Sequence, residues 1–218
     1  MVSSTVENYL KAILHLQGEG AGSTTVGEIA KELWVTPGTV TMMMRQLKER
    51  RLIAYEPRRG VSLLALGRAE ALKVVRRHRL IETFLVEIMQ LDWSEVHEEA
   101  EILEHVISDR LLDRMDKMLG EPTHDPHGDP IPDRNGVVVE NTALSLLEVE
   151  AGDYRIVRVS DEDSSLLGWL DDKGLTIGEE FSLCDSDRPA GLLELVRRDG
   201  ERLPLGLQVA GRVFVEAV

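Results

Sequence analysis

The sequence of 218 residues contains one cysteine, Cys184. A single thiol cannot form an internal disulfide, which fits a reducing compartment. It also excludes a metal cluster held by several thiolates. Any metal site in this chain must therefore use histidine and carboxylate side chains.

Long apolar runs are missing as well. No run approaches the roughly 18 residues of a membrane span. The N-terminal residues turn amphipathic at once, without the cationic start, apolar stretch and cleavage site of a signal peptide. We therefore expect a cytoplasmic protein without membrane contact. The chain exceeds the common length of one domain, so we expect two or three.

Positive charge is scarce, but only in one part of the chain. The formal net charge is −14. Residues 1–80 carry 13 Lys and Arg against 7 Asp and Glu, whereas residues 81–218 carry 12 against 32. This asymmetry suggests that the N-terminal part meets a polyanion and that the rest does not. An acidic protein with a locally basic helix pair is the alternative that charge alone leaves open.

The N-terminal stretch has the order helix, tight turn, helix, hairpin. After an amphipathic helix over residues 5–16, Thr25 and Thr36 are expected to cap two further helices. Short β-prone runs at 52–55 and 61–64 flank the turn "EPRRG". This order is typical of a winged helix-turn-helix.

The last of these helices carries the features of a DNA-reading element. Short polar residues at its start permit close approach to base edges and phosphates, and an exposed methionine there would meet a thymine methyl. Arginines at the hairpin tip would hold phosphates or the minor groove. A protein-interaction module of the same shape is the alternative. The predicted DNA-binding residues are Thr36, Pro37, Gly38, Thr39, Thr41, Met42, Arg45, Lys48, Arg58 and Arg59.

Two long helical patterns follow, over residues 65–90 and 94–120, the second capped by Ser94 and ended by Gly120. At about 3.6 residues per turn, ligand-type side chains share one stripe of the second helix. The stripe comprises His97, Glu101, Glu104 and His105. The preceding helix offers His78 and Glu82, again four residues apart.

Three interpretations of this stripe compete. Acidic residues alone would indicate a solvated helix face, and one histidine alone would indicate a structural role. Three histidines at such spacing over two adjoining helices favour a divalent metal site instead. Carboxylate oxygen and imidazole nitrogen would converge there, and the ion would neutralise a repulsive cluster.

Taken together, these segments resemble the iron- and manganese-dependent repressors of the diphtheria toxin repressor and manganese transport regulator family. The resemblance covers about residues 4–135. It lies in "TVENYLKAI", "TPGTVTMMMRQL", "RRHRLIETFL", "VHEEAEILEHVISD" and "DPHGDPIP", in the family's order and spacing.

The resemblance implies two metal sites per subunit. The first would join the N-terminal helix to Glu101, Glu104 and His105, and the second would use His78, Glu82 and His97. Family members place aspartate or methionine where this chain has Asn8, so Asn8 or its neighbour Glu7 would complete the first site. A carboxylate at Glu101, where iron-responsive members have cysteine, implies Mn²⁺, with Fe²⁺ as the alternative.

The segment "THDPHGDPIPDRNG" contains His124, Asp125, His127 and Asp129. Because proline-rich loops seldom hold a preorganised cluster, we expect mainly a linker here. From Leu144 the pattern changes to short strands separated by turns, which predicts a five-stranded barrel.

This C-terminal part resembles the SH3-like (FeoA-like) domain of some family members, which lends an acidic ligand to the second metal site. In the stretch "SDEDSS", Glu162 and Asp163 are the candidates for that ligand. An acidic loop without a ligand role is the alternative.

The sequence thus predicts a mainly α fold with a small β part in three domains. Residues 1–64 form a winged helix-turn-helix, 65–140 a helical metal-binding and dimerisation domain, and 141–218 an SH3-like β-barrel. The resemblance implies a homodimeric repressor, not an enzyme, that binds palindromic operator DNA with Mn²⁺ or Fe²⁺ as co-repressor and represses metal-uptake genes. One alternative is a regulator that does not respond to metal. The other is a carboxylate-bridged metalloenzyme, but this sequence lacks the paired Glu-x-x-His motifs of such enzymes.

Overall fold

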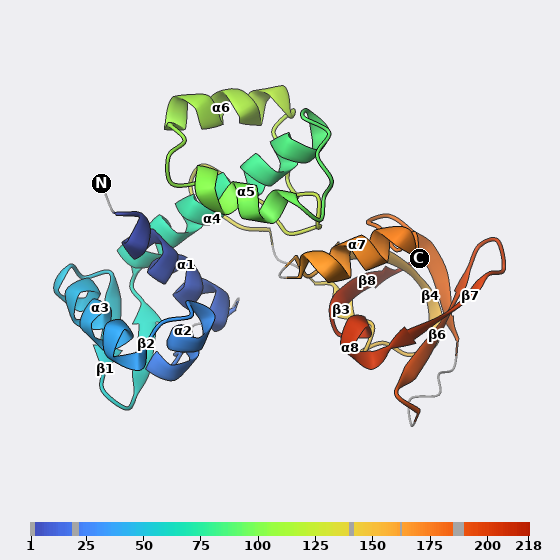
Figure 1. Ribbon diagram of the computed structural model, residues 1–218, viewed down its shortest axis with the longest axis horizontal. Coiled ribbons are helices and arrows are strands. Elements are labelled where there is room, and N and C mark those ends of the chain that lie inside the picture. Colours follow the sequence, from blue (N-terminus) through green and yellow to red (C-terminus); the bar gives the residue numbers. More distant parts are fainter. Residues whose placement is uncertain (1–2, 19–21, 140–141, 162, 185–189) are drawn as a thin grey trace. The chain divides into compact units, whose positions relative to one another are not determined.

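The computed structural model describes residues 3–18, 22–139, 142–161, 163–184 and 190–218, and it divides into two compact units (Figure 1). The first unit comprises Met1–His78 and Pro132–Val137, and the second comprises Arg79–Ile131 and Val138–Val218. No helix among the described residues is both long and apolar enough to cross a membrane.

The first unit has the predicted order of helices and strands. It contains α1 (Ser4–Gln17), α2 (Val26–Glu32), α3 (Pro37–Glu49), β1 (Ile53–Glu56), β2 (Gly60–Leu63) and the first part of α4 (Ala65–Glu87). The two strands pair antiparallel, with Ile53 opposite Leu63 and Glu56 opposite Gly60. The winged helix-turn-helix is therefore confirmed as the fold of this part of the chain.

Local hydrogen bonds explain where α2 and α3 begin. Thr25 and Glu28 form a capping box, in which the Thr25 hydroxyl accepts from the Glu28 N–H and the Glu28 carboxylate accepts from the Thr25 N–H. The Thr36 hydroxyl accepts from the Thr39 N–H at 3.2 Å, and Pro37 is the first residue of α3. Both predicted caps are confirmed.

One apolar core holds α1, α2, α3 and the hairpin together. The inner face of α3 consists of Val40, Met44 and Leu47, all fully buried. They meet Leu10 from α1 and Ile29 from α2 in the same cluster. Each such side chain contributes on the order of 1.5–3 kcal/mol of burial free energy, so this core fixes the orientation of α3.

The helical part of the second unit differs from the prediction. The expected single helix over 94–120 is wrong, because it consists of α5 (Val96–Leu103) and α6 (Asp109–Met118). The Ser108 hydroxyl accepts from the Leu111 N–H and starts α6. Ser94 is no cap, since its hydroxyl donates to the Asp92 carboxylate. The break between the helices allows Ile107 to pack against two neighbouring apolar clusters.

The rest of the second unit is built on one antiparallel sheet. Its elements are β3 (Leu144–Ser145), β4 (Gly152–Val159), α7 (Ser164–Asp172), β5 (Glu180–Cys184), β6 (Leu192–Arg197), β7 (Arg202–Gly206), α8 (Leu207–Ala210) and β8 (Val213–Ala217). The strand order is β3-β8-β4-β5-β6-β7. Among the described residues no pairing joins β3 to β7, so the sheet does not close into the predicted barrel.

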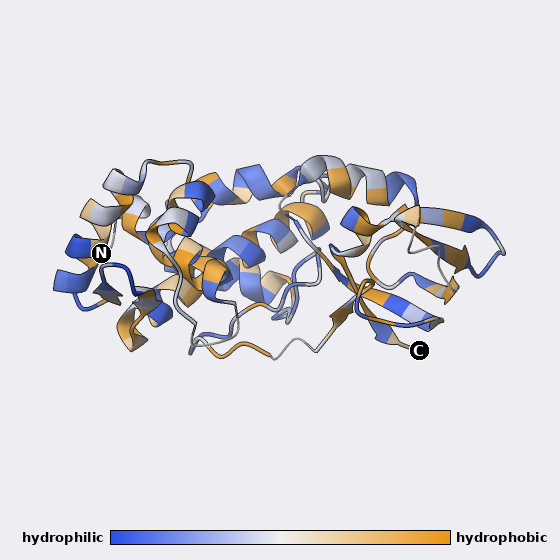
Figure 2. Ribbon diagram, turned by 90° about the horizontal axis from the view of Figure 1, so that it is seen from below, coloured by the Kyte–Doolittle hydropathy of each residue, from blue (hydrophilic) through white to orange (hydrophobic). Residues whose placement is uncertain are grey.

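Two further features of this sheet were not predicted. The last β-prone run divides at α8, which raises the number of strands from five to six. Helix α7 packs Leu167 and Leu170 into the apolar core of the sheet, together with Ile156 of β4. Figure 2 shows apolar and polar residues alternating along several of these elements. Asp161 and Asp163 lie in the connection from β4 to α7, so the packing of α7 fixes where this acidic stretch runs.

Candidate metal centre and DNA interface

Three elements of the second unit bring an imidazole and carboxylates together. Glu82 lies on α4, His97 in the first turn of α5, and Asp161 just after β4. His97 Nδ1 is 3.2 Å from Glu82 Oε1 and 3.6 Å from Asp161 Oδ2. His97 Nε2 is 3.8 Å from Glu101 Oε1, one helical turn further along. The structure thus joins three predicted ligands to Asp161, which we did not predict.

The carboxylates around His97 determine its protonation. Hydrogen bonds to Asp161 and then to Glu82 raise the pKa of His97 from 6.5 to about 10, against the opposing effect of its burial. At neutral pH the ring is therefore an imidazolium whose charge offsets the buried Glu82 carboxylate. A metal ion requires the neutral imidazole, so an ion bound here must displace a proton.

We expect this displacement to be measurable. Because the pKa of His97 is about 10 in the folded protein without metal, proton competition weakens metal binding below that pH, and affinity rises by up to about tenfold per pH unit as pH increases towards it. The stability that the charged ring contributes follows the same sign. It is fully present below about pH 6.5 and is lost as pH rises through about 10. Calorimetry with Mn²⁺ at pH 7 in buffers of different ionisation enthalpy should detect the release of protons. His97→Gln should lower that release by about one proton per subunit, and an unchanged release in this variant would contradict the assignment.

A second pair of predicted ligands lies at the end of α5. Glu104 is fully buried at the C-cap position, and His105 Nε2 is 3.4 Å from its Oε1. Because α5 ends at Leu103, His105 lies in the following turn and does not continue the helical stripe that we predicted. Glu104 and His105 are nonetheless close enough to share one cation.

The loop over residues 123–131 supplies ligand-type groups that we did not predict as such. His127 is fully buried, and its Nε2 lies 2.9 Å from the Trp93 carbonyl oxygen, so Nε2 carries the proton and donates. Its Nδ1 is buried without a hydrogen-bond partner in the described part of the chain. Donor atoms of Glu82, Asp125 and His127 lie within 4.8 Å of one another. We expected mainly a linker here, and the burial of Asp125 and His127 beside Glu82 departs from that expectation, whereas His124 is exposed as a linker residue would be.

Half-buried arginines hold the acids of this loop. Arg79 Nε is 3.5 Å from Asp125 Oδ2, and Arg79 Nη2 is 3.3 Å from Asp129 Oδ1. Arg158 of β4 approaches Asp129 at 3.6 Å. Burial raises the pKa of Asp125 well above its ordinary value, the charges of Asp129 and Glu82 raise it further, and Arg79 opposes this. A divalent cation next to Asp125 would stabilise the charged carboxylate.

Gly128 fixes this loop against β4. Its φ is +87°, and a Cβ atom there would lie 2.0 Å from the Val157 carbonyl oxygen. The adjacent carbonyl oxygen of His127 accepts from the Val159 N–H at 2.9 Å. The glycine is therefore required for the close approach of two backbones.

We expect Gly128→Ala to destabilise the protein by about 3–5 kcal/mol, because the clash and the left-handed backbone each cost roughly 1–3 kcal/mol. Chemical denaturation would measure the loss. Gly200→Ala is the matched control, since Gly200 has φ +89° and no atom within 4 Å of a new Cβ. It should cost about 1 kcal/mol. Equal losses in the two variants would show that the packing of the loop is unimportant.

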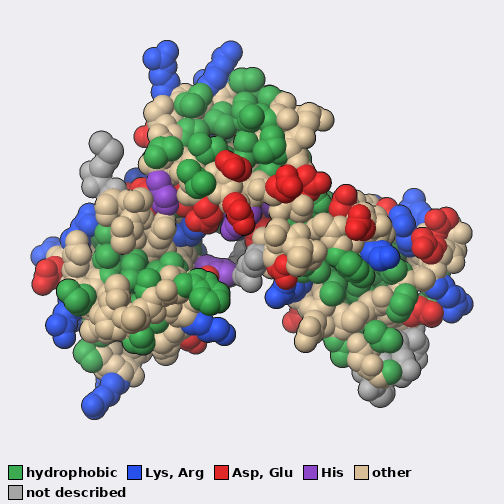
Figure 3. All heavy atoms as spheres, in the orientation of Figure 1, with side chains coloured by type: hydrophobic (Ala, Val, Ile, Leu, Met, Phe, Trp, Pro, Cys, Tyr) green, Lys and Arg blue, Asp and Glu red, His purple; other side chains and the backbone are tan. Residues whose placement is uncertain are grey.

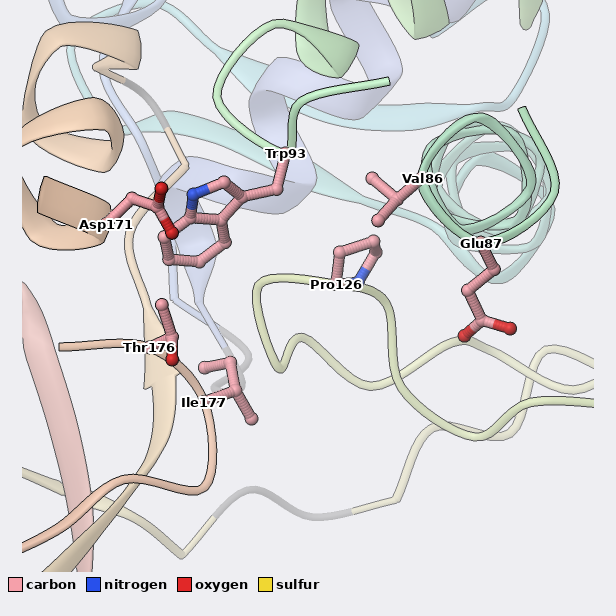
Figure 4. Close-up of a pocket in the computed structure, with 7 residues that line it drawn as sticks. All are labelled: Val86, Glu87, Trp93, Pro126, Asp171, Thr176 and Ile177. Carbon is pink, nitrogen blue, oxygen red and sulfur yellow. The ribbon is translucent and has the colours of Figure 1, made fainter. Parts of the chain in front are cut away.

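A pocket of about 320 Å³ lies beside this loop (Figure 4). It is lined by Val86, Glu87, Trp93, Pro126, Asp171, Thr176 and Ile177. The Trp93 ring also stacks on the His127 ring, with centroids 5.5 Å apart and planes at 22°. The indole therefore covers one side of the imidazole, which helps to keep water from it.

Of the two acids predicted from the "SDEDSS" stretch, the described one, Asp163, is not the acid near His97. Asp163 caps α7, where it accepts from the N–H groups of Ser165 and Leu166, and it pairs with Arg212 at 3.1 Å. Hydrogen bonds from Ser165 and then Leu166 lower the pKa of Asp163. Glu162 lies outside the described residues. Asp161 is the member of this stretch that approaches His97.

In the first unit, α1 presents the remaining predicted ligands. Asn8 Oδ1 is buried and has no hydrogen-bond partner in the described chain, which is uncommon for an amide oxygen. Such an oxygen could serve as a ligand to a metal ion. Glu7 Oε1 accepts from Arg77 at 3.4 Å. His78, on α4, is buried, and its Nδ1 is 3.5 Å from Lys11 Nζ. An ammonium only donates, so His78 Nδ1 accepts there.

The predicted DNA-contacting side chains of α3 are mostly exposed. Gly38, Thr39 and Arg45 are exposed, and the Met42 side chain is 74% exposed. Thr36 is occupied as the helix cap, and the Thr41 hydroxyl donates to the Pro37 carbonyl oxygen at 2.8 Å. The exposed residues are thus available to a partner, whereas Thr36 and Thr41 mainly shape the start of the helix.

Basic side chains continue from α3 onto the hairpin. Arg58 lies exposed in the turn with φ +70°, and Arg59 pairs with Glu56 at 3.1 Å on the surface. Lys48 Nζ donates to the Tyr55 carbonyl oxygen at 2.9 Å. Lys48 therefore ties α3 to the hairpin. On the face drawn in Figure 3, Lys and Arg side chains project from the first unit.

A winged helix-turn-helix with an exposed basic hairpin, together with buried carboxylate and imidazole groups, defines a DNA-binding protein that carries divalent-cation sites. Comparisons with known proteins agree with this class. Residues 1–61 match the N-terminal DNA binding domain of iron dependent repressors, residues 65–133 their metal binding and dimerisation domain, and residues 144–217 the FeoA domain.

Relatives match over nearly the whole length. The iron-dependent repressor IdeR of Mycobacterium leprae is 31% identical, covering 98% of this chain and 97% of its own. The diphtheria toxin repressor of Corynebacterium efficiens is also 31% identical, and the match covers 98% of this chain and 96% of the repressor. This chain belongs to the iron-dependent repressor family, which also includes the diphtheria toxin repressors.

Solved structures give the same result. A manganese-dependent transcriptional repressor in complex with manganese has a TM-score of 0.91 at 34% identity, covering 98% of this chain and 100% of its own. The repressor ScaR with bound Zn²⁺ has a TM-score of 0.83 at 36% identity, with coverage of 98% and 99%. The predicted family is therefore confirmed. Its members are transcriptional repressors rather than enzymes.

Proposed function

We propose that this chain is a metal-dependent transcriptional repressor that binds operator DNA when Mn²⁺, or alternatively Fe²⁺, occupies its carboxylate and imidazole sites. One observation carries the proposal: Glu82, His97 and Asp161, from three separate elements, converge with His97 Nδ1 within 3.2 Å and 3.6 Å of the two carboxylates. A solvated acidic face would not bury Glu82 completely.

The donor chemistry supports Mn²⁺. The described ligand groups offer carboxylate oxygen, amide oxygen and imidazole nitrogen, which are hard or borderline donors. Cys184, the only thiol, lies on β5 within the sheet. Because Mn²⁺ binds more weakly than later first-row metals at a given site, selectivity would depend on geometry and on the cell's metal supply.

We propose two ions per subunit. Glu101, Glu104 and His105 would hold the first, completed by Asn8 or Glu7 of the N-terminal helix, and that completion rests on the family resemblance alone. His78, Glu82 and His97 would hold the second. Asp161, Asp125 and His127 extend this set. Glu82 belongs to both described groups around it, and we propose that these groups serve one ion.

The ligands themselves explain why an ion would matter. Unneutralised carboxylates repel one another in a buried setting, and a bound cation supplies the charge that stabilises them together. If DNA binds better to the metal-loaded form, metal and DNA must strengthen each other's binding by the same factor. This mutual strengthening is what would make the metal ion a co-repressor.

We further propose a homodimer on palindromic DNA, with domains at 1–64, 65–140 and 141–218, the last in the SH3-like arrangement. Exposed apolar side chains on and between α4, α5 and α6 support self-association. They include Ile88, Met89, Ile102, Val106, Leu111 and Met118. Two α3 helices in a dimer would read half-sites about 10–10.5 base pairs apart.

The test is selection of double-stranded DNA from a random library by the full-length protein, with and without Mn²⁺ or Fe²⁺, followed by affinity measurement against free metal concentration. We expect a palindrome to be enriched only with metal. A palindrome that is bound equally well without metal would identify a regulator that does not respond to metal and would refute the proposal.

A further inference from the structure

Trp34 occupies the turn between α2 and α3 in an unusual conformation. Its φ is +53°, and its side chain is 95% exposed. The turn is a Schellman motif, in which the Val35 N–H donates to the Ala30 carbonyl and the Trp34 N–H to the Lys31 carbonyl. Trp34 is thus at the position where helices usually place glycine.

A tryptophan at this position does not stabilise the fold. A left-handed backbone is unfavourable for a bulky residue, and an indole that is 95% exposed buries almost no apolar surface. Glycine would adopt the same backbone without strain. The structure of the isolated chain therefore gives no reason for tryptophan here, and a contact with a partner would.

The surroundings of Trp34 indicate the kind of partner. Trp34 lies two residues before Thr36, the cap of α3, and so beside the N-terminal end of that helix, whose dipole favours phosphate. Among residues 22–63, Trp34 and Met42 are the only exposed large apolar side chains, and both belong to the turn and the helix of the DNA-reading element. Residues 1–80 also carry an excess of six positive charges.

We propose that the Trp34 indole packs against the sugar–phosphate backbone of bound double-stranded DNA, beside the groove that α3 enters. The flat apolar ring would cover a deoxyribose, and the indole N–H would donate to a phosphate oxygen. This inference rests on the proposed function and adds a contact that does not depend on base sequence. Contacts of this kind position the protein on DNA and do not select the operator.

The test uses Trp34→Gly in the full-length protein with Mn²⁺. The variant should unfold at the same temperature as the wild type or higher, since glycine suits the backbone. Its affinity should fall about tenfold for both the selected operator and an unrelated duplex, because a backbone contact contributes equally to both. Leu66→Ala is the matched control, as Leu66 is 63% exposed on α4, and it should leave both affinities unchanged.

A second measurement does not depend on any variant. The chain has three tryptophans, so 5-fluorotryptophan labelling gives three ¹⁹F resonances. Adding the operator duplex should shift the resonance of Trp34. Wild-type affinity of Trp34→Gly for both duplexes, with an unshifted resonance, would overturn the inference and point to a protein partner. Failure of the proposed function would look different, since the wild type itself would not bind DNA at any Mn²⁺ concentration, and Trp34 would then have no DNA contact either.

Discussion

Replacing Glu82 by Gln should remove one bound ion per subunit and weaken Mn²⁺ binding at that site by at least about 100-fold. The reason is that Glu82 is fully buried and approaches His97 from α4, while Asp125 and His127 lie within reach of the same carboxylate. Even residues that only support a metal ligand contribute 10–100-fold to affinity. The DNA affinity in Mn²⁺ should fall towards its metal-free value.

Calorimetric titration with Mn²⁺ gives both stoichiometry and affinity for this variant. Glu87→Gln is the matched control, because Glu87 lies on the same helix but is exposed. Glutamine keeps the shape of glutamate and removes a buried charge, so the metal-free variant should remain folded. Two ions per subunit bound with wild-type affinity would remove Glu82 from the site.

Glu104→Gln should remove the other ion. Glu104 is fully buried at the end of α5, 3.4 Å from the imidazole of His105, so its carboxylate has no solvent to replace the cation. We expect a loss of Mn²⁺ affinity of about 100-fold at this site. The second ion, at Glu82 and His97, should remain.

Glu99→Gln is the control for this experiment, since Glu99 is on α5 and exposed. The double variant of Glu82 and Glu104 should bind no Mn²⁺ in the same concentration range. If each single variant loses the same ion, the protein has one site per subunit, and the proposal of two is wrong.

Local signals made the N-terminal unit predictable. The caps at Thr25 and Thr36 and the inner face of α3 follow from interactions between residues at most four positions apart. The sequence also indicated His97, Glu101 and Glu82 as ligand-type residues, because i, i+4 spacing places side chains on one helix face wherever the helix lies.

Prediction failed where packing between distant segments decided the structure. The helix expected over 94–120 breaks because Ile107 packs in two clusters and Ser108 caps a new helix. The loop around His127 looked like a linker, because its proline and glycine content gives no sign that Gly128 packs on Val157. Helix α7 was not predicted, although it carries the apolar residues Leu166, Leu167 and Leu170 directly after an acidic stretch.

The sequence by itself determined the chemistry of this protein: one cysteine excluded a cluster of several thiolates, and regular spacing indicated carboxylates and imidazoles on helices that follow a basic DNA-reading element in the chain. Only the tertiary structure decided which further acids join them. Asp161 approaches His97 while Asp163 caps a helix, and Asp125 and His127 are buried beside Glu82. The physical reason is the distance along the chain over which the interactions act. Hydrogen bonds between residues a few positions apart fix the spacing of side chains on a helix, whereas the approach of a loop to a helix depends on the core that packs them together.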